Sequence, residues 1–118
     1  SEPVQVVGYS MGGRLALQAL VKNPARFRRA LLLSARPAMP SAEAAGREAW
    51  ELSWAKRFQS EPWEQLTREW QRLEVFGTSP ELPRRSENPI LREMLAQSLV
   101  NWSPRHHADV ALRMKDLP

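Results

Sequence analysis

A short glycine-containing turn near the amino terminus constrains the fold of this chain more than any other feature. The motif G-Y-S-M-G at positions 8–12 directly follows a β-type run over 4–7 and directly precedes a helix-type run. Strand, sharp turn and helix in this order, with G-x-S-x-G in the turn, are typical of a nucleophile elbow. Because the turn is tight, Gly8 and Gly12, two residues before and after the serine, have to be small. The pattern therefore predicts that Ser10 is a nucleophile.

The elbow also predicts where negative charge would be stabilised. Ser10 is expected at the carboxyl end of a sheet, above the N-terminus of the following helix. The backbone N–H of Met11 would then point to the place where an oxyanion forms, and the helix dipole would reinforce it. The alternative is a glycine-rich β–α turn with an incidental serine, but the strand and amphipathic helix around the motif favour the elbow.

The first forty residues are predicted to form a β–α–β unit. Strands over 4–7 and 29–34 flank a helix over 12–22, which the pair Asn23-Pro24 ends. The second strand is an unbroken apolar run, so we expect it to be buried on both faces of a parallel sheet.

The remainder of the chain is mostly helical by pattern. Helices are expected over 41–58, 62–73, 88–100 and 104–114. This order predicts an α/β fold, namely a fragment of an α/β-hydrolase with the elbow, followed by a mostly helical cap. The expected divisions are 1–40 as part of the hydrolase core, 41–103 as the helical cap, and 104–118 as a helix that returns to the core.

The length of the chain limits which catalytic groups it can contain. An α/β-hydrolase sheet with its helices usually needs about twice 118 residues, so we expect a piece of a larger enzyme that is inactive by itself. The histidine and the acid of a Ser-His-Asp triad are expected outside the chain. His106, His107 and Asp109 lie on the last expected helix, before the next strand would begin, and are not expected to be the triad partners.

Charge and composition exclude several classes of partner. The net charge is +4, but residues 41–103 hold eight Lys and Arg against ten Glu, and no basic face with interleaved aromatic residues emerges. We therefore expect no nucleic acid as a partner, and no membrane either, because no apolar run is long enough to cross one. Without cysteine, the chain can form neither a disulfide framework nor a thiolate metal site. Without a leader or a membrane-spanning run, the expected location is the cytoplasm. The fourteen Arg against three Lys favour a carboxylate-rich ligand.

Two arginines are placed unusually for a soluble helix. Arg47 shares a helical stripe with Trp50, Trp54 and Phe58, and an inward arginine needs an anion. That anion could be a substrate carboxylate or a glutamate one turn away, and the pattern leaves both open. Arg14 opposes the dipole in the first turn of the elbow helix, which a local anion would explain. The tryptophans of the cap, including Trp63, are expected to be core more often than binding surface.

These residues bring a resemblance to a known family. The G-Y-S-M-G-G-R segment, the helix from Arg47 to the W-A-K-R-F motif, the Trp70 region and R-S-E-N at 85–88 resemble the 2-succinyl-6-hydroxy-2,4-cyclohexadiene-1-carboxylate synthases of menaquinone biosynthesis. The resemblance implies a carbon–oxygen lyase that uses a Ser-His-Asp triad to eliminate pyruvate from a polycarboxylated cyclohexene, without metal or cofactor. It also implies substrate contacts from the following residues: Tyr9, Arg14, Arg47, Trp70 and Arg85.

Two other functions remain open at this point. One is a general esterase, thioesterase or C–C hydrolase of the same fold, and the other is a self-standing helical interaction module. The module would have to fold alone. A two-stranded sheet with apolar faces and open edges makes this difficult, so we expect copies of the chain to associate or to exchange elements.

Overall fold

The fold comes from a computed structural model, which describes residues 2–78 and 86–117. The chain divides into two compact units, one made of residues 1–45 and 102–118 and the other of residues 46–101. Each unit is described by itself. In chain order, the helices and strands are β1 (Val4–Tyr9), α1 (Met11–Lys22), η1 (Pro24–Arg26), β2 (Phe27–Leu33), α2 (Ser41–Ser60), α3 (Trp63–Gln71), η2 (Glu74–Phe76), α4 (Pro89–Asn101), η3 (Pro104–His106) and η4 (Ala111–Asp116), where η marks a 3-10 helix.

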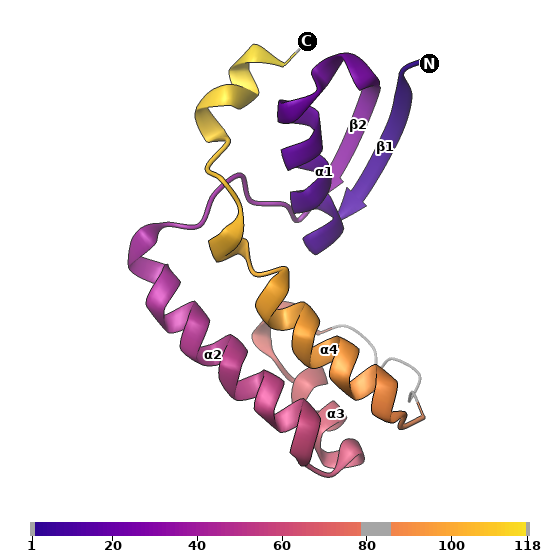
Figure 1. Cartoon of the computed structure of the whole chain (residues 1–118), viewed down its shortest axis with the longest axis vertical. Coiled ribbons are helices and arrows are strands. Elements are labelled where there is room, and N and C mark those ends of the chain that lie inside the picture. The colour runs from indigo at the N-terminus through magenta and orange to yellow at the C-terminus, as the bar shows by residue number, and fades with distance from the viewer. Residues whose placement is uncertain (1, 79–85, 118) are drawn as a thin grey trace. The chain divides into compact units, whose positions relative to one another are not determined.

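The first unit contains a two-stranded parallel sheet with helix α1 packed against it (Figure 1). Leu17 and Val21 of α1 are buried together with Val110, and Leu32 of β2 packs against them. Helix α1 ends where predicted, because Asn23 caps it through its N–H to the Ala19 carbonyl. The predicted β–α–β unit is thereby confirmed.

The sheet is covered on one face only, which corrects the expectation that its second strand is buried on both. Side chains alternate between the faces of a strand, so Val7 and Tyr9 share a face with their cross-strand neighbours Leu31 and Leu33. The exposed fractions of Val7 and Leu31 are 71% and 55%. Helix α1 covers the opposite face, and within the described residues this apolar face stays open.

The predicted last helix, 104–114, is wrong as a continuous element. Two short 3-10 helices stand there, η3 and η4, with residues 107–110 between them. The N–H of Val110 donates to the Pro37 carbonyl at 3.2 Å and so leaves the helical pattern. Asp109 then accepts the N–H of Ala111 at 2.9 Å, which starts a new turn.

The second unit is formed by α2 from residue 46 onwards, α3, η2 and α4, and these helices lie close to the bounds expected from the sequence (Figure 1). Its core is a cluster of buried side chains from the three α-helices: Trp54, Ala55, Phe58, Trp63, Leu66 and Ala96. Trp54 and Trp63 are therefore core residues, as expected. None of the helices in the described ranges is long and apolar enough to cross a membrane.

Candidate active site

Ser10 lies in the sharp turn between β1 and α1, with φ 50° and ψ −116°. This left-handed conformation is uncommon for a residue other than glycine and stores strain on the order of 1 kcal/mol or more. The turn is fixed from both sides. The Ser10 N–H donates to the Leu33 carbonyl of β2 at 2.9 Å, and the Ser10 carbonyl accepts the first helical bond from Arg14 at 2.9 Å. The side chain of Ser10 is exposed at the carboxyl edge of the sheet.

The glycines around Ser10 differ from the expectation at one position. A Cβ added at Gly8 would lie 2.7 Å from the Gly13 Cα, so β1 and α1 meet here without room for a side chain. A Cβ at Gly12 would meet nothing within 4 Å, whereas one at Gly13 would lie 2.9 Å from the Ala35 Cβ. The close approach therefore needs Gly8 and Gly13, and the requirement for a small residue at Gly12 is wrong.

Met11 is the first residue of α1, so its N–H is among the four that have no acceptor within the helix. This is the arrangement that an oxyanion site needs, and the role of Met11 stays a prediction. Tyr9, the last residue of β1, is paired in register with Leu33 and is 68% exposed. Tyr9, Ser10 and Met11 thus follow one another across the elbow.

Arg14 lies one helical turn after Ser10 and reaches the segment that returns from the second unit of the chain. Its Nη2 donates to the Trp102 carbonyl at 3.5 Å. His107 lies in the same region. Burial, then the positive charge of Arg14 and the neighbouring His106, hold the pKa of His107 below its usual value. The guanidinium of Arg14 therefore brings a positive charge close to His107.

The Ser10 hydroxyl has no general base within the described residues. It makes no capping hydrogen bond, and no bond joins it to a histidine or a carboxylate in the described part of the chain. His106 belongs to η3 and His107 follows it. The described residues also hold no group of three histidines or acids that could bind a metal ion.

Arg47 of the second unit is paired with a buried glutamate. Its Nε donates to Glu51 Oε1 at 2.6 Å, and the Glu51 side chain is fully buried. The guanidinium also lies 4.6 Å from the Trp50 ring centroid. The structure thus shows the pairing with a glutamate one turn away, and contact with a substrate carboxylate stays a prediction. Glu43 pairs instead with Arg36 at 3.1 Å.

Trp70 belongs to the aromatic cluster of the second unit. Its ring centroid lies 4.9 Å from that of Trp54 and 5.3 Å from that of Phe58, both edge-on. Trp50 and Phe76 complete the cluster at 5.8 and 6.1 Å. Trp70 is only partly buried, and its contact with a substrate stays a prediction. Arg85 lies outside the described residues.

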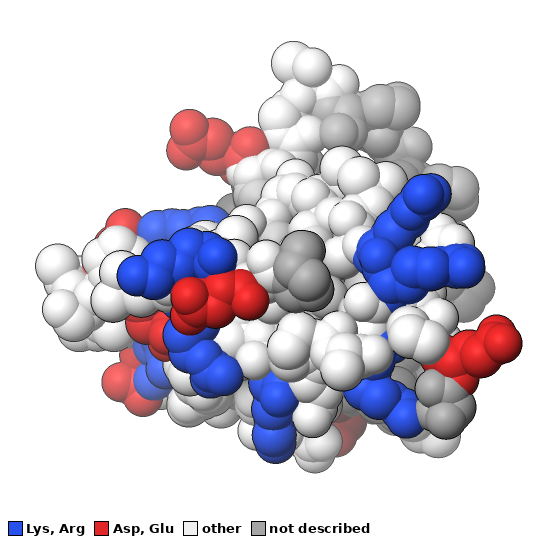
Figure 2. All heavy atoms as spheres, turned by 90° about the horizontal axis from the view of Figure 1, so that it is seen from above, with Lys and Arg blue, Asp and Glu red and all other residues white. Residues whose placement is uncertain are grey.

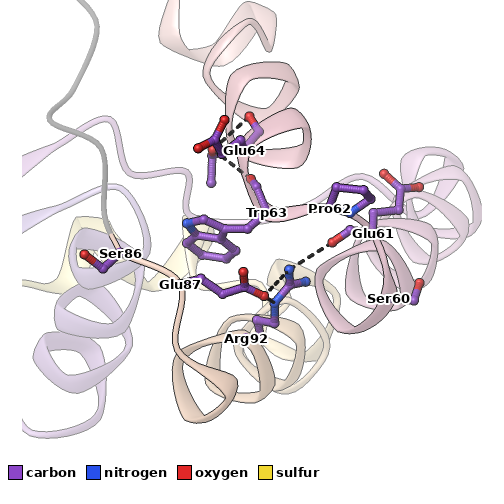
Figure 3. Close-up of a pocket in the computed structure, with 9 residues that line it drawn as sticks. Ser60, Glu61, Pro62, Trp63, Glu64, Ser86, Glu87 and Arg92 are labelled. Carbon is purple, nitrogen blue, oxygen red and sulfur yellow. Dashed lines mark hydrogen bonds and ion pairs between the residues drawn. The ribbon is translucent and has the colours of Figure 1, made fainter.

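A separate hollow of about 750 Å³ lies in the second unit, beside the side chain of Arg92 (Figure 3). Arg92 Nη1 and Nη2 donate to the carbonyls of Phe58 and Glu61 at 2.7 and 2.9 Å, where α2 ends. Glu87 pairs with the same guanidinium, and the Trp63 ring centroid lies 5.3 Å from it. Because the guanidinium N–H groups of Arg92 bond to these partners, Arg92 holds α4 to the end of α2. Sequence reasoning missed this role, for which spacing gives no signal.

Lys and Arg side chains form small separate groups on the face shown in Figure 2, with Asp, Glu and uncharged surface between the groups. The described part of this face therefore offers no continuous basic patch of the kind that follows a nucleic-acid backbone.

The sheet, the strained elbow and the helical insertion define a class of protein. Residues 1–89 match the family of the alpha/beta hydrolase fold, and the chain belongs to this family. This confirms the predicted fold class, and relatives of the chain are enzymes of this fold.

Particular relatives narrow the comparison. A synthase named 2-succinyl-6-hydroxy-2,4-cyclohexadiene-1-carboxylate synthase, from Escherichia coli O1:K1, is 33% identical over 81 residues, which are 68% of this chain and 32% of the relative. A protein of the same name from Klebsiella pneumoniae is 34% identical over 74 residues, which are 62% of this chain and 29% of the relative. These relatives confirm the resemblance found in the sequence. The chain spans about a third of the length of the curated relatives it matches.

The structure of MenH from S. aureus is similar in fold, with a TM-score of 0.80 and 24% identity. The match covers 98% of this chain and 46% of that one. The likeness therefore extends over the elbow unit and the helices that follow it.

Proposed function

We propose that the protein to which this chain belongs is a carbon–oxygen lyase of menaquinone biosynthesis, which eliminates pyruvate from a polycarboxylated cyclohexene. The observation that carries the proposal is the strained Ser10 elbow with Arg14 one turn behind it, in a chain whose relatives carry the synthase name. That name describes a ring with a succinyl group and a carboxylate. A ligand of this kind is a small polyanion, which arginine recognises well.

The roles follow from the position of each residue. Ser10, deprotonated by a histidine, removes a proton from a ring carbon. The electron pair of that C–H bond forms a new C=C bond, and the C–O bond to the enolpyruvyl group breaks. The proton passes to the histidine, and the departing enolate takes up a proton to become pyruvate. The Met11 N–H stabilises the negative charge that develops. Substrate carboxylates and ring contact the remaining residues: Tyr9, Arg14, Arg47, Trp70 and Arg85. No metal or cofactor takes part, and we place the reaction in the cytoplasm.

Arg47 carries a consequence for this scheme. Its guanidinium is already neutralised by Glu51, so it can offer a substrate only the donors that Glu51 leaves open. Arg47 then orients a substrate carboxylate without adding a full net charge. Arg14, one helical turn after Ser10, brings a positive charge to the elbow.

We also propose that the 118-residue chain alone does not turn over substrate. The support is the absence, within the described residues, of a base bonded to Ser10. A serine without an adjacent base is a weak nucleophile and a weak base.

A comparison of two reactions tests the proposal. The intact protein is expected to release pyruvate from the cyclohexene substrate and to hydrolyse simple esters poorly. Arg14→Gln is expected to lower kcat/KM for pyruvate release by at least tenfold, because a charge-assisted hydrogen bond is lost. An intact protein that hydrolyses esters or thioesters well and releases no pyruvate would be a general hydrolase of the same fold.

A further inference from the structure

A second serine in the first unit has the same unusual backbone as Ser10. Among the described residues, two residues other than glycine have a positive φ: Ser10 at 50° and Ser34 at 52°. Each serine is the first residue after a strand at the carboxyl edge of the sheet: Ser10 follows β1 and Ser34 follows β2. The elbow explains the first of these, and the proposed roles leave the second unused.

Contacts on both sides place Ser34 next to the elbow. Leu33, the residue before it, accepts the N–H of Ser10 at 2.9 Å. Ala35, the residue after it, packs closely against α1: a Cβ added at Gly13 would lie 2.9 Å from the Ala35 Cβ. Neighbouring strands lie about 4.8 Å apart, so Ser34 stands beside Ser10 along this edge.

The residue type at this position is informative. Glycine adopts a left-handed backbone without steric cost, and asparagine tolerates it better than serine does. A serine here accepts strain and in return provides a hydroxyl. Ser34 is exposed, and within the described ranges its hydroxyl makes no hydrogen bond that would use it locally.

We propose that the Ser34 hydroxyl donates a hydrogen bond to the substrate bound over Ser10 and so helps to determine specificity. The inference rests on the proposed function insofar as it takes the ligand to be a carboxylate. A hydroxyl that donates to a carboxylate forms a strong, charge-assisted bond. Ser34 would thus complement Arg14 from the neighbouring strand, with the elbow between them.

The backbone part of the inference is tested by stability. Ser34→Gly in the intact protein is expected to raise Tm by about 2 °C, because glycine relieves the left-handed strain. Ser53→Gly is the matched control, since Ser53 is an exposed residue within α2 and glycine there weakens the helix. If Ser34→Gly lowers Tm as Ser53→Gly does, the claim that the backbone at Ser34 is strained is overturned.

The hydroxyl part is tested by kinetics on the same protein. Ser34→Ala is expected to raise KM for the cyclohexene substrate about tenfold while Tm changes little, and Ser34→Asn to restore part of the affinity. Ser53→Ala is expected to leave KM unchanged. An unchanged KM for Ser34→Ala would overturn the substrate contact.

The two failures can be told apart. If the wild-type protein releases no pyruvate, the proposed function fails, and the same KM comparison is then made on the best carboxylate-bearing ester. A tenfold higher KM on that ester supports the Ser34 contact independently of the reaction, and an unchanged one overturns it.

Discussion

At the scale of single residues, the turn at Ser10 depends on a few backbone positions. Ser10 holds a left-handed conformation because β1, α1 and β2 fix it through two backbone hydrogen bonds of 2.9 Å. Gly8 and Gly13 allow β1 and α1 to approach closely enough for this turn. The strain at Ser10 is therefore supported by packing that lies outside the serine itself.

The two glycines after Ser10 lead to a specific prediction about stability. Gly13→Ala is expected to destabilise the protein by about 1–3 kcal/mol, because the new methyl group would overlap Ala35 and the Gly8 backbone. Gly12→Ala should be neutral or slightly stabilising, since its Cβ meets nothing within 4 Å in the described structure and alanine favours a helix. Urea unfolding of both variants measures this. Equal losses would contradict the account of the close approach.

The sequence was sufficient to predict the elbow but not the residues that pack against it. Ser10 and Gly8 could be found because a strand, a turn and a helix leave a local pattern. Gly13 and Ser34 could not, since their constraints come from Ala35 and Leu33, which are brought close only by the fold. Arg47 was ambiguous for a similar reason: spacing allowed Glu43 or Glu51, and the packing of α2 decided for the buried Glu51.

At the scale of elements, a single arginine fixes two helices of the second unit to each other. Arg92 of α4 donates to the carbonyls of Phe58 and Glu61 and has a side chain that is only 13% exposed (Figure 3). The last carbonyls of a helix have no N–H donor within the helix. The Arg92 guanidinium supplies donors at the end of α2 and so acts as its cap.

Truncation of that arginine should cost more than truncation of a surface arginine. Arg92→Ala is expected to lower the free energy of unfolding by about 2–4 kcal/mol, since two charge-assisted hydrogen bonds and the contact with Trp63 are lost. Arg68→Ala is the control, because Arg68 is half exposed and 4.0 Å from Glu64. Its effect should stay within about 0.5 kcal/mol. A comparable effect of both, measured by chemical unfolding, would rule out the bridging role.

Helix prediction illustrates where pattern reasoning ends at this scale. Helices α2, α3 and α4 follow an apolar stripe and were placed within a few residues. The region 104–114 has a helix start signal at Ser103-Pro104, yet Val110 bonds to Pro37 and the helix breaks. A long-range bond of this kind overrides a local signal and leaves no trace in the spacing.

At the scale of the whole molecule, the open face of the sheet governs the behaviour of the chain. Val7, Tyr9, Leu31 and Leu33 form a cross-strand apolar face with exposed fractions between 48% and 71%. A small parallel sheet with such a face and open edges is marginal in water. We propose that copies of the chain associate through this face or exchange elements.

Charge on that face should reduce the association. Val7→Lys places an ammonium opposite Leu31, in register across the two strands, and is expected to shift the chain towards monomer. Leu52→Lys, at a residue of α2 that is 52% exposed, should leave the association unchanged. Light scattering at several protein concentrations measures the molecular mass of the species in solution. A sharp wild-type monomer at all concentrations would contradict the proposal.

The central claim is that Ser10 is the catalytic group of a pyruvate-releasing enzyme, and one assay tests it most directly. Pyruvate release from the cyclohexene substrate is measured for the intact wild-type protein and for Ser10→Ala. The account predicts release by the wild type and a loss of about 10³-fold or more in kcat for Ser10→Ala, with an unchanged Tm within a few degrees. A Ser10→Ala protein that releases pyruvate at the wild-type rate would contradict it.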